Sequence, residues 1–199
     1  MPNTQHAIGV FPLPICLLPN GVTRLRIFEQ RYIRLVSEAS RGDGFVMSLF
    51  DQSMPFNSSD YGVWVEIIDF ETLSDGLLSI KVLAKSLVKL TEFSQDNDKL
   101  HRANMKTISH WSQQQTLMGY EQHVTADLAH ALKKIFDNHQ ELTSYYPAPC
   151  YQDIAWVCAR FIEILPLSFS KKHQLIFVQN FEQCQNFLHT VISGDQIVK

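Results

Sequence analysis

A proline-punctuated apolar run and the amphipathic segment after it constrain the fold of this chain most. Residues 11–21 read FPLPICLLPNG, and residues 25–32 read LRIFEQRY. Proline has no N–H to donate to a strand ladder, so the three prolines of the run predict edge-strand and loop geometry. Gly21 permits the positive φ of a tight turn. We therefore expect an extended entry, a turn, and a helix whose first turn carries an aromatic residue, an acid, a base and a second aromatic residue (Phe28, Glu29, Arg31 and Tyr32).

The first 115 residues carry mostly strand and turn signals. Apolar residues from Phe28 to Ala39 recur at helical spacing, which predicts one helix that ends near Gly42. Ser-Asp-Gly at 74–76 is typical of a hairpin turn, and the stretches around it are rich in β-branched and aromatic residues. The predicted strands are residues 8–13, 44–50, 61–73, 77–83, 86–93 and 100–108. Short strands in this number, with one early helix, predict a small and mostly antiparallel β-barrel.

Beyond residue 115 the apolar residues recur at helical spacing instead. They form stripes within residues 124–136, 154–165, 175–178 and 181–191. Pro166 should end the second of these helices, and Ser168 or Ser170 can cap the third. Short connections between such helices favour a compact bundle. We therefore predict an α+β fold, with a β-rich domain at 1–115 and a helical subdomain at 116–199.

Composition and charge argue against several classes of protein. Hydrophobic residues make up 45% of the 199 residues, enough to bury a core. The formal net charge of −3 makes nucleic acid an unlikely partner for the whole domain. No apolar run approaches about eighteen residues, and the N-terminus lacks the pattern of a secretory signal. We expect a cytoplasmic protein without membrane association, whose four scattered cysteines are reduced core residues.

A recognisable pattern runs through the early segment: Phe-Pro-Leu at 11–13, then Pro19, Gly21 and Leu25, then Ile-Phe-Glu at 27–29 and Arg-Tyr at 31–32. It resembles the start of the N-terminal substrate-binding domain of Lon-type ATP-dependent proteases. The resemblance extends over about residues 8–191 and includes Gly62, the Asp75-Gly76 turn and residues 165–168. It implies a six-stranded PUA-like barrel followed by a helical part. The chain departs from the family at residues 84–88, where the family usually carries a Gly-x-x-Arg-Phe element.

The sequence lacks the motifs of the catalytic parts of a Lon protease. It has no Gly-x-x-x-x-Gly-Lys-Ser/Thr phosphate loop, and only Gly194 follows residue 119 among the glycines. No Gly-x-Ser-x-Gly elbow and no His-Glu-x-x-His pair is present. We therefore expect a stand-alone binding domain that is not an enzyme and that holds no metal and no cofactor.

The candidate binding residues lie at the start of the predicted helix: Arg26, Phe28, Glu29, Arg31 and Tyr32. Four arginines between 24 and 34 form a positive cluster around Glu29, which could meet an acidic peptide or a protein partner. The same residues also fit a solvated helix face with local ion pairs. The two aromatic residues could floor a peptide groove, or they could anchor the helix in the core.

We predict a non-catalytic module that recognises exposed apolar segments of unfolded or extended polypeptide, in connection with ATP-dependent proteolysis. The polypeptide would bind by strand addition at an exposed edge and by apolar pockets beside the early helix. Two alternatives stay open: an RNA-binding PUA-like protein, and an adaptor that docks on a separate protease or ATPase. The loop at 51–61 is predicted to be mobile and could cover the groove. The sequence leaves the client, the partner and the oligomeric state open.

Overall fold

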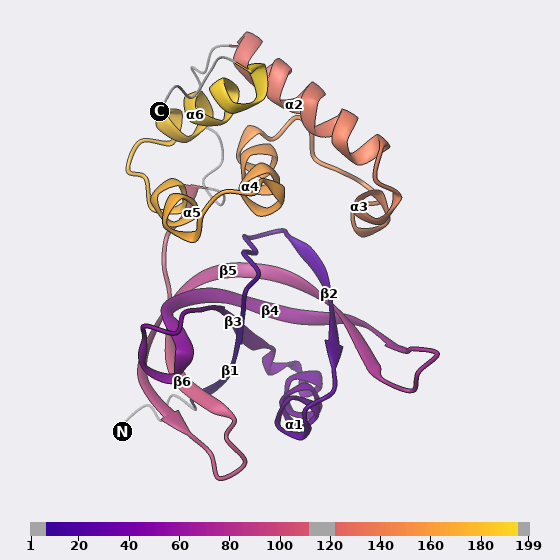
Figure 1. Ribbon diagram of the computed structural model, residues 1–199, viewed down its shortest axis with the longest axis vertical. Helices are drawn as coiled ribbons and strands as arrows, with labels where there is room; N and C mark the ends of the chain where they lie inside the picture. The colour runs from indigo at the N-terminus through magenta and orange to yellow at the C-terminus, as the bar shows by residue number, and fades with distance from the viewer. Residues whose placement is uncertain (1–6, 112–121, 195–199) are drawn as a thin grey trace. The chain divides into compact units, whose positions relative to one another are not determined.

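The chain divides into two compact units between Ser109 and His110. A computed structural model describes residues 7–111 and 122–194, which are the coloured parts of Figure 1. The predicted domain boundary at 115/116 falls between these ranges, outside the described residues.

The described part of the first unit contains a six-stranded mixed sheet, as the sequence predicts for an α+β fold. Its strands are β1 (Ile8–Leu13), β2 (Val22–Ile27), β3 (Phe45–Phe50), β4 (Ser58–Thr72), β5 (Leu78–Gln95) and β6 (His101–Thr107). The pairing order is β2-β5-β4-β3-β1-β6, and β6 pairs with β5 as well. The pairings thus run in a closed circuit through β5, β4, β3, β1 and β6, with β2 added on β5. All pairings are antiparallel except that of β1 with β3.

The predicted number of strands, six, is correct, but two of the strand assignments are wrong. The sequence reading left residues 22–27 unassigned, but they form β2, in which Arg24 and Arg26 are exposed and Leu25 and Ile27 are buried. The predicted strands 77–83 and 86–93 are one continuous strand, β5. Between them the register with β4 shifts by one residue, so the break in the apolar pattern is a β-bulge and not a turn.

The prediction of edge-strand and loop geometry for the prolines is confirmed, although β1 as a whole is not an edge strand, and Pro14 and Pro19 lie in the loop after it. β1 has a neighbour on each side: Ile8 to Val10 pair with β6, and Val10 to Leu13 pair with β3. Pro12 lies in the half that pairs with β3 alone, opposite Ser48. A proline is tolerated there because one side of this half of the strand has no partner that needs its N–H.

One helix packs against the sheet in the first unit (Figure 1). Helix α1 (Gln30–Glu38) begins after Glu29, whose backbone is extended, and buries Tyr32, Leu35 and Val36. These side chains share a core with apolar residues of five strands, including Phe11, Leu25 and Phe45. The helix approaches β1 so closely that a Cβ on Gly9 would lie 2.1 Å from Leu35 Cδ1.

The end of α1 agrees with the predicted stop. A π-helical turn (Ala39–Asp43) follows α1, and within it Gly42 has φ 112°, outside the helical region. The chain then passes Gly44, where φ is 61° and a Cβ would lie 2.3 Å from the carbonyl oxygen of Val65. Only glycine fits that position, because both the backbone angle and the space exclude a side chain.

The described part of the second unit is helical (Figure 1). Its helices are α2 (Gln122–Asp137), α3 (Gln140–Tyr145), α4 (Ile154–Ile164), α5 (Phe169–Ile176) and α6 (Phe181–Ser193). Helix α2 contacts α3, α4 and α6, and α4 also contacts α6. Asp153 caps α4, and Ser168, one of the two predicted residues, caps α5. The sequence reading missed the short α3. None of the helices described is long and apolar enough to span a membrane.

Candidate functional site

A cavity of about 410 Å³ in the first unit brings the five predicted binding residues together. Its wall is formed by the end of β1, the end of β2, the start of α1, the ends of β3 and β5, the start of β6 and the loop between β3 and β4. The lining residues are Phe11, Pro12, Leu13, Arg26, Phe28, Glu29, Arg31, Tyr32, Phe50, Phe56, Asn57, Gln95 and His101. We call this cavity the groove. The role of the five residues in binding stays a prediction.

The two predicted aromatic residues occupy different positions in the groove. Phe28 lies between β2 and α1, and 67% of its surface is exposed. Tyr32 is 7% exposed, and its ring stacks on that of Phe11 with 3.7 Å between centroids. Burial raises the pKa of Tyr32, although the nearby Arg31 lowers it. The core-anchor alternative therefore holds for Tyr32 and is wrong for Phe28, which precedes the helix and presents a large apolar side chain to solvent.

The charged residues of the groove are paired. Arg31 donates from Nε to Glu29 Oε2 over 2.8 Å and from Nη1 to the carbonyl oxygen of Lys99 over 3.2 Å. Its guanidinium also lies 4.6 Å from the centroid of the Tyr32 ring. Arg26 forms an exposed ion pair with Asp75 at the tip of the β4–β5 hairpin. The groove therefore has both aromatic and polar walls, and its charges are nearly balanced.

The predicted positive cluster does not form. Arg24 pairs with Glu71 on β4, and Arg34 pairs with Glu38, Asp96 and Asp98. Neither arginine lines the groove. Most of the acidic partners lie 47 to 64 positions away in the sequence, so local charge counting could not find them. Each of the four arginines is paired with at least one carboxylate, so together they form no basic surface.

Part of the groove wall consists of residues that the sequence analysis did not single out. Phe56 lies in a 3₁₀ turn (Pro55–Asn57), where both Phe56 and Asn57 have positive φ. Its ring stacks on Phe93 and meets His101 edge-on, with centroids 5.7 and 5.5 Å apart. The N–H of Asp51 donates to the carbonyl of Asn57 over 3.1 Å and closes this loop. The predicted loop at 51–61 is thus shorter, because β4 already begins at Ser58. Aromatic residues in a loop have no periodic signal that could have revealed them.

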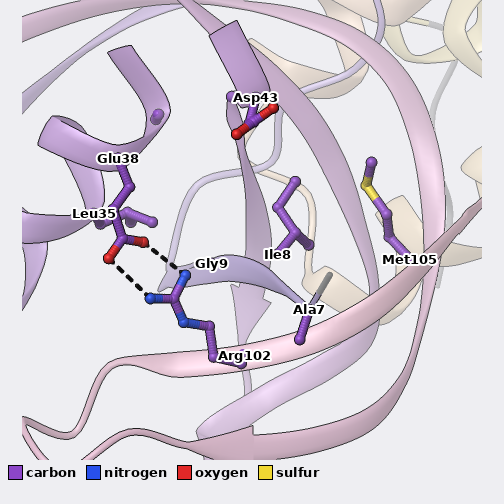
Figure 2. Close-up of a pocket in the computed structure, with 10 residues that line it drawn as sticks. Ala7, Ile8, Gly9, Leu35, Glu38, Asp43, Arg102 and Met105 are labelled. Carbon is purple, nitrogen blue, oxygen red and sulfur yellow. Dashed lines mark hydrogen bonds and ion pairs between the residues drawn. The ribbon is translucent and has the colours of Figure 1, made fainter. Parts of the chain in front are cut away.

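A second cavity of about 350 Å³ lies near the start of β1 (Figure 2). In Figure 2 the Glu38 carboxylate accepts from Arg102, with contacts of 2.8 Å from Nη1 to Oε2 and 3.0 Å from Nη2 to Oε1. Asp43 and Met105 lie on the other side of this cavity. None of the five predicted residues lines it, and two of its charged groups, Glu38 and Arg102, belong to the ion pairs that hold α1.

Residues suited to metal or nucleophilic chemistry do not gather in the described ranges. No group of three His, Cys, Asp or Glu residues there could hold a metal ion. None of the four cysteines is in a disulfide. Cys158 and Cys184 are buried, and burial raises the pKa of Cys158, which makes its thiol inert. The prediction that all four are core residues is wrong for Cys150, which is exposed, and for Cys16, which is partly exposed.

A six-stranded sheet, a helix and the groove between them define the class of this chain as a domain of mixed α+β fold. The family model of the ATP-dependent protease La (LON) substrate-binding domain matches residues 7–187, and the chain belongs to this family. This result confirms the family resemblance seen in the sequence. A comparison with curated protein sequences found no match.

Solved structures support the same fold. The Lon N-terminal domain protein from Xanthomonas campestris is 24% identical, with a TM-score of 0.70, and the match covers 92% of this chain and 96% of that one. The N-terminal domain of the Lon protease from Mycobacterium avium complex is 10% identical, with a TM-score of 0.62, and the match covers 96% and 100%. At these identities the likeness concerns the fold alone.

Proposed function

We propose that this chain is a non-catalytic module that binds exposed apolar segments of unfolded or extended polypeptide in the groove. The observation that carries the proposal is the exposure of Phe28 at the rim of a groove whose floor includes the Phe11–Tyr32 stack. A large exposed apolar side chain beside an apolar concavity is typical of a surface that a ligand covers. Membership of the substrate-binding family supports the same reading.

The edge of β2 would add main-chain contacts to the apolar ones. Among the described strands, β2 pairs with β5 alone. Alternate residues of β2 direct their N–H and C=O groups away from β5, where an extended segment could add as a further strand. Arg26 near the end of β2 and Phe28 just after it line the groove, so a strand added there would continue into the apolar site.

The bound polypeptide would be a substrate of ATP-dependent proteolysis. This link rests on the family, which is that of the substrate-binding domain of an ATP-dependent protease. We expect micromolar affinity, because a shallow groove gains little above the cost of association. RNA binding is disfavoured, because every arginine between 24 and 34 is paired with a carboxylate.

A matched pair of substitutions tests the groove. Phe28→Ala should weaken binding of a fluorescent, permanently unfolded polypeptide about tenfold, since the ring would lose its apolar contact area with the ligand. Phe70→Ala is the control, because Phe70 is 51% exposed on β4 and does not line the groove. Affinity is measured by fluorescence anisotropy at low and high salt, after circular dichroism has shown that both variants are folded.

The result separates the candidate functions. Salt-tolerant binding that depends on Phe28 and not on Phe70 supports the proposal. Equal losses in the two variants, or no loss in either, would place the binding site elsewhere. A labelled single-stranded RNA serves as the competing ligand, and salt-sensitive binding to it alone would favour the nucleic-acid alternative. Binding to neither ligand would favour the adaptor that docks on a protease or ATPase.

A further inference from the structure

His101 is a polar side chain enclosed in the apolar part of the groove. It is the first residue of β6, and its main chain is paired with Val10 on one side and Gln95 on the other. Only 9% of its surface is exposed, yet the side chain lines the groove. Its ring meets the edge of Phe56, with 5.5 Å between centroids. Within residues 7–111 and 122–194, neither ring nitrogen of His101 forms a hydrogen bond.

The ring nitrogens of His101 are not among the fully buried polar atoms that lack a partner, so they still reach the solvent of the groove, and a ligand that displaces this solvent has to supply their hydrogen bonds. A donor or acceptor withdrawn from water without a hydrogen bond costs about 1–3 kcal/mol, so buried polar groups are nearly always satisfied. Because His101 faces the groove and not the closed core, a bound molecule can supply this partner. The groove therefore combines aromatic walls with a small number of polar groups, which is the usual composition of a ligand pocket.

The surroundings of His101 select the kind of partner. The charged and titratable groups that line the groove with it are Arg26 on β2, Glu29 before α1, and Arg31 and Tyr32 on α1. Arg31 and Glu29 neutralise each other, and Arg26 is paired with Asp75. Burial lowers the pKa of His101, and the charge of Arg31 lowers it further. At neutral pH the ring is thus uncharged, with one N–H donor and one nitrogen acceptor.

The other polar groups near the ring are neutral too. Asn57 follows Phe56 in the loop, and its exposed side-chain amide makes no hydrogen bond with the described residues. Gln95, opposite His101 in the β5–β6 pairing, donates only a long hydrogen bond of 3.5 Å to Lys99. One side of the groove thus presents an imidazole and two amides, each able to donate and to accept. This pattern complements a peptide group, which has one N–H and one C=O in every residue.

We propose that His101 hydrogen-bonds a main-chain peptide group of the bound polypeptide, with Asn57 and Gln95 beside it, while the aromatic wall takes the side chains. This inference rests on the proposed function and names the chemistry of the same site. A main-chain anchor holds any extended segment in register without reading its sequence. The groove would then accept many polypeptides, provided that each presents apolar side chains next to an accessible main chain.

Two substitutions in the full-length chain test the anchor. His101→Gln keeps a donor and an acceptor but cannot be protonated in the physiological range, whereas His101→Leu keeps the volume and removes both hydrogen-bonding groups. With the labelled unfolded polypeptide at pH 7.5, we expect His101→Leu to weaken binding about three- to tenfold and His101→Gln to stay within about twofold of wild type. Two peptides of the same composition in scrambled order should show the same loss. His130→Leu, on an exposed position of α2, is the matched control.

The dependence of affinity on pH supplies a readout that a purely structural role would not move. A bound peptide covers the ring, so protonation of His101 becomes less favourable in the complex than in the free protein. Wild-type affinity should therefore fall as the pH drops from 7.5 to 5.5, and this fall should be smaller in His101→Gln. The comparison between the two proteins cancels any effect of the other groups in the groove.

Several outcomes would overturn the proposed role of His101. Equal affinity of His101→Leu and wild type overturns it, and so does a His101→Gln variant as weak as His101→Leu. Scrambled peptides that differ in their dependence on His101 would show that the imidazole reads a side chain, which overturns the main-chain assignment. If wild type fails to bind unfolded polypeptide at all, the proposed function falls and this inference with it. Binding that depends on Phe28 but not on His101 leaves the proposed function in place and rejects the anchor alone.

Discussion

His110 at the start of the second unit should link the stability of that unit to pH. The side chain is 4% exposed, and its Nε2–H donates to the carbonyl oxygen of Ile176 over 3.1 Å. Burial lowers the pKa of His110 to about 4, whereas an unfolded histidine titrates near 6.5. Because the folded state resists protonation, the contribution of His110 is complete above pH 6.5 and is lost as the pH falls from 6.5 toward 4.

The prediction is measured by urea unfolding at pH 7.5 and pH 4.5. Wild type should lose about 2 kcal/mol more free energy of unfolding between these pH values than His110→Gln, which can still donate to the carbonyl of Ile176. His139→Gln is the control, since His139 is exposed and makes its contact within α2 and the turn after it. Parallel pH profiles of wild type and His110→Gln would contradict the assignment.

At the residue scale, the family pattern located the groove better than periodicity did. All five residues taken from positions 26–32 line one cavity, which spacing alone could not establish. Periodicity placed Phe28 on the buried stripe of the helix, but the helix starts two residues later and leaves the ring in solvent. His101 and Phe56 could not be found at all, because pairings across the sheet bring them to the groove from distant segments.

At the element scale, a network of ion pairs ties α1 to the β5–β6 turn. Asp96 in that turn accepts from Arg34 on α1 and, over 3.0 Å, from Nε of Arg102 on β6. Arg34 also contacts Asp98 at 2.7 Å, and Arg102 contacts Glu38 at 2.8 Å. Burial raises the pKa of Asp96, but the hydrogen bonds from the two arginines outweigh burial and bring the pKa below its usual value of 3.8. The network holds the helix that forms one wall of the groove.

Asp96→Asn should therefore reduce the free energy of unfolding by about 1 kcal/mol at pH 7, a modest value because these groups are partly exposed and screened by solvent. A carboxyl group with a lowered pKa stabilises the folded state above about pH 4, and this contribution is lost as the pH falls through the folded pKa. The difference between wild type and Asp96→Asn should shrink at pH 3 and in 1 M salt. Chemical unfolding at both pH values measures it.

Asp75→Asn is the matched control for this network. Asp75 makes one exposed ion pair, with Arg26, and asparagine can keep the hydrogen bond that Asp75 Oδ1 accepts from the Leu77 N–H, so the replacement should change the stability by less than about 0.5 kcal/mol. If the two variants lose the same stability, the network contributes no more than an isolated surface pair, and another contact must hold α1 in place.

The predicted secondary structure agrees with the observed one where neighbouring residues in the sequence determine the conformation. The hairpin turn at 74–76, the stop near Gly42 and the cap at Ser168 could be predicted, because each depends on residues within one turn of chain. β2 could not, since its six residues gain their strand conformation by pairing with β5, more than 50 positions away. The bulge in β5 is likewise a property of its pairing with β4, and the local sequence shows it only as a gap in the apolar pattern.

At the scale of the whole molecule, the first unit holds every component of the groove. All lining residues lie between Phe11 and His101, and both apolar cores beneath them are built from residues of this unit alone. The last pairing of the sheet joins Val88 to Thr107, and the N–H of Ile108 donates to the carbonyl of Leu87 over 3.0 Å. A chain that ends at Ser109 therefore retains each strand and each groove residue.

A fragment of residues 1–109 should bind the unfolded polypeptide within about twofold of the full-length affinity, because distant sites contribute to binding almost additively. Circular dichroism and thermal unfolding establish first that the fragment is folded, and anisotropy then gives its affinity. Phe28→Ala in the fragment should cause the same loss as in the full chain, since the ring would meet the ligand in the same groove. A folded fragment without affinity would show that the helical unit takes part in recognition. A fragment that binds but no longer depends on Phe28 would show that its affinity comes from surface exposed by the truncation.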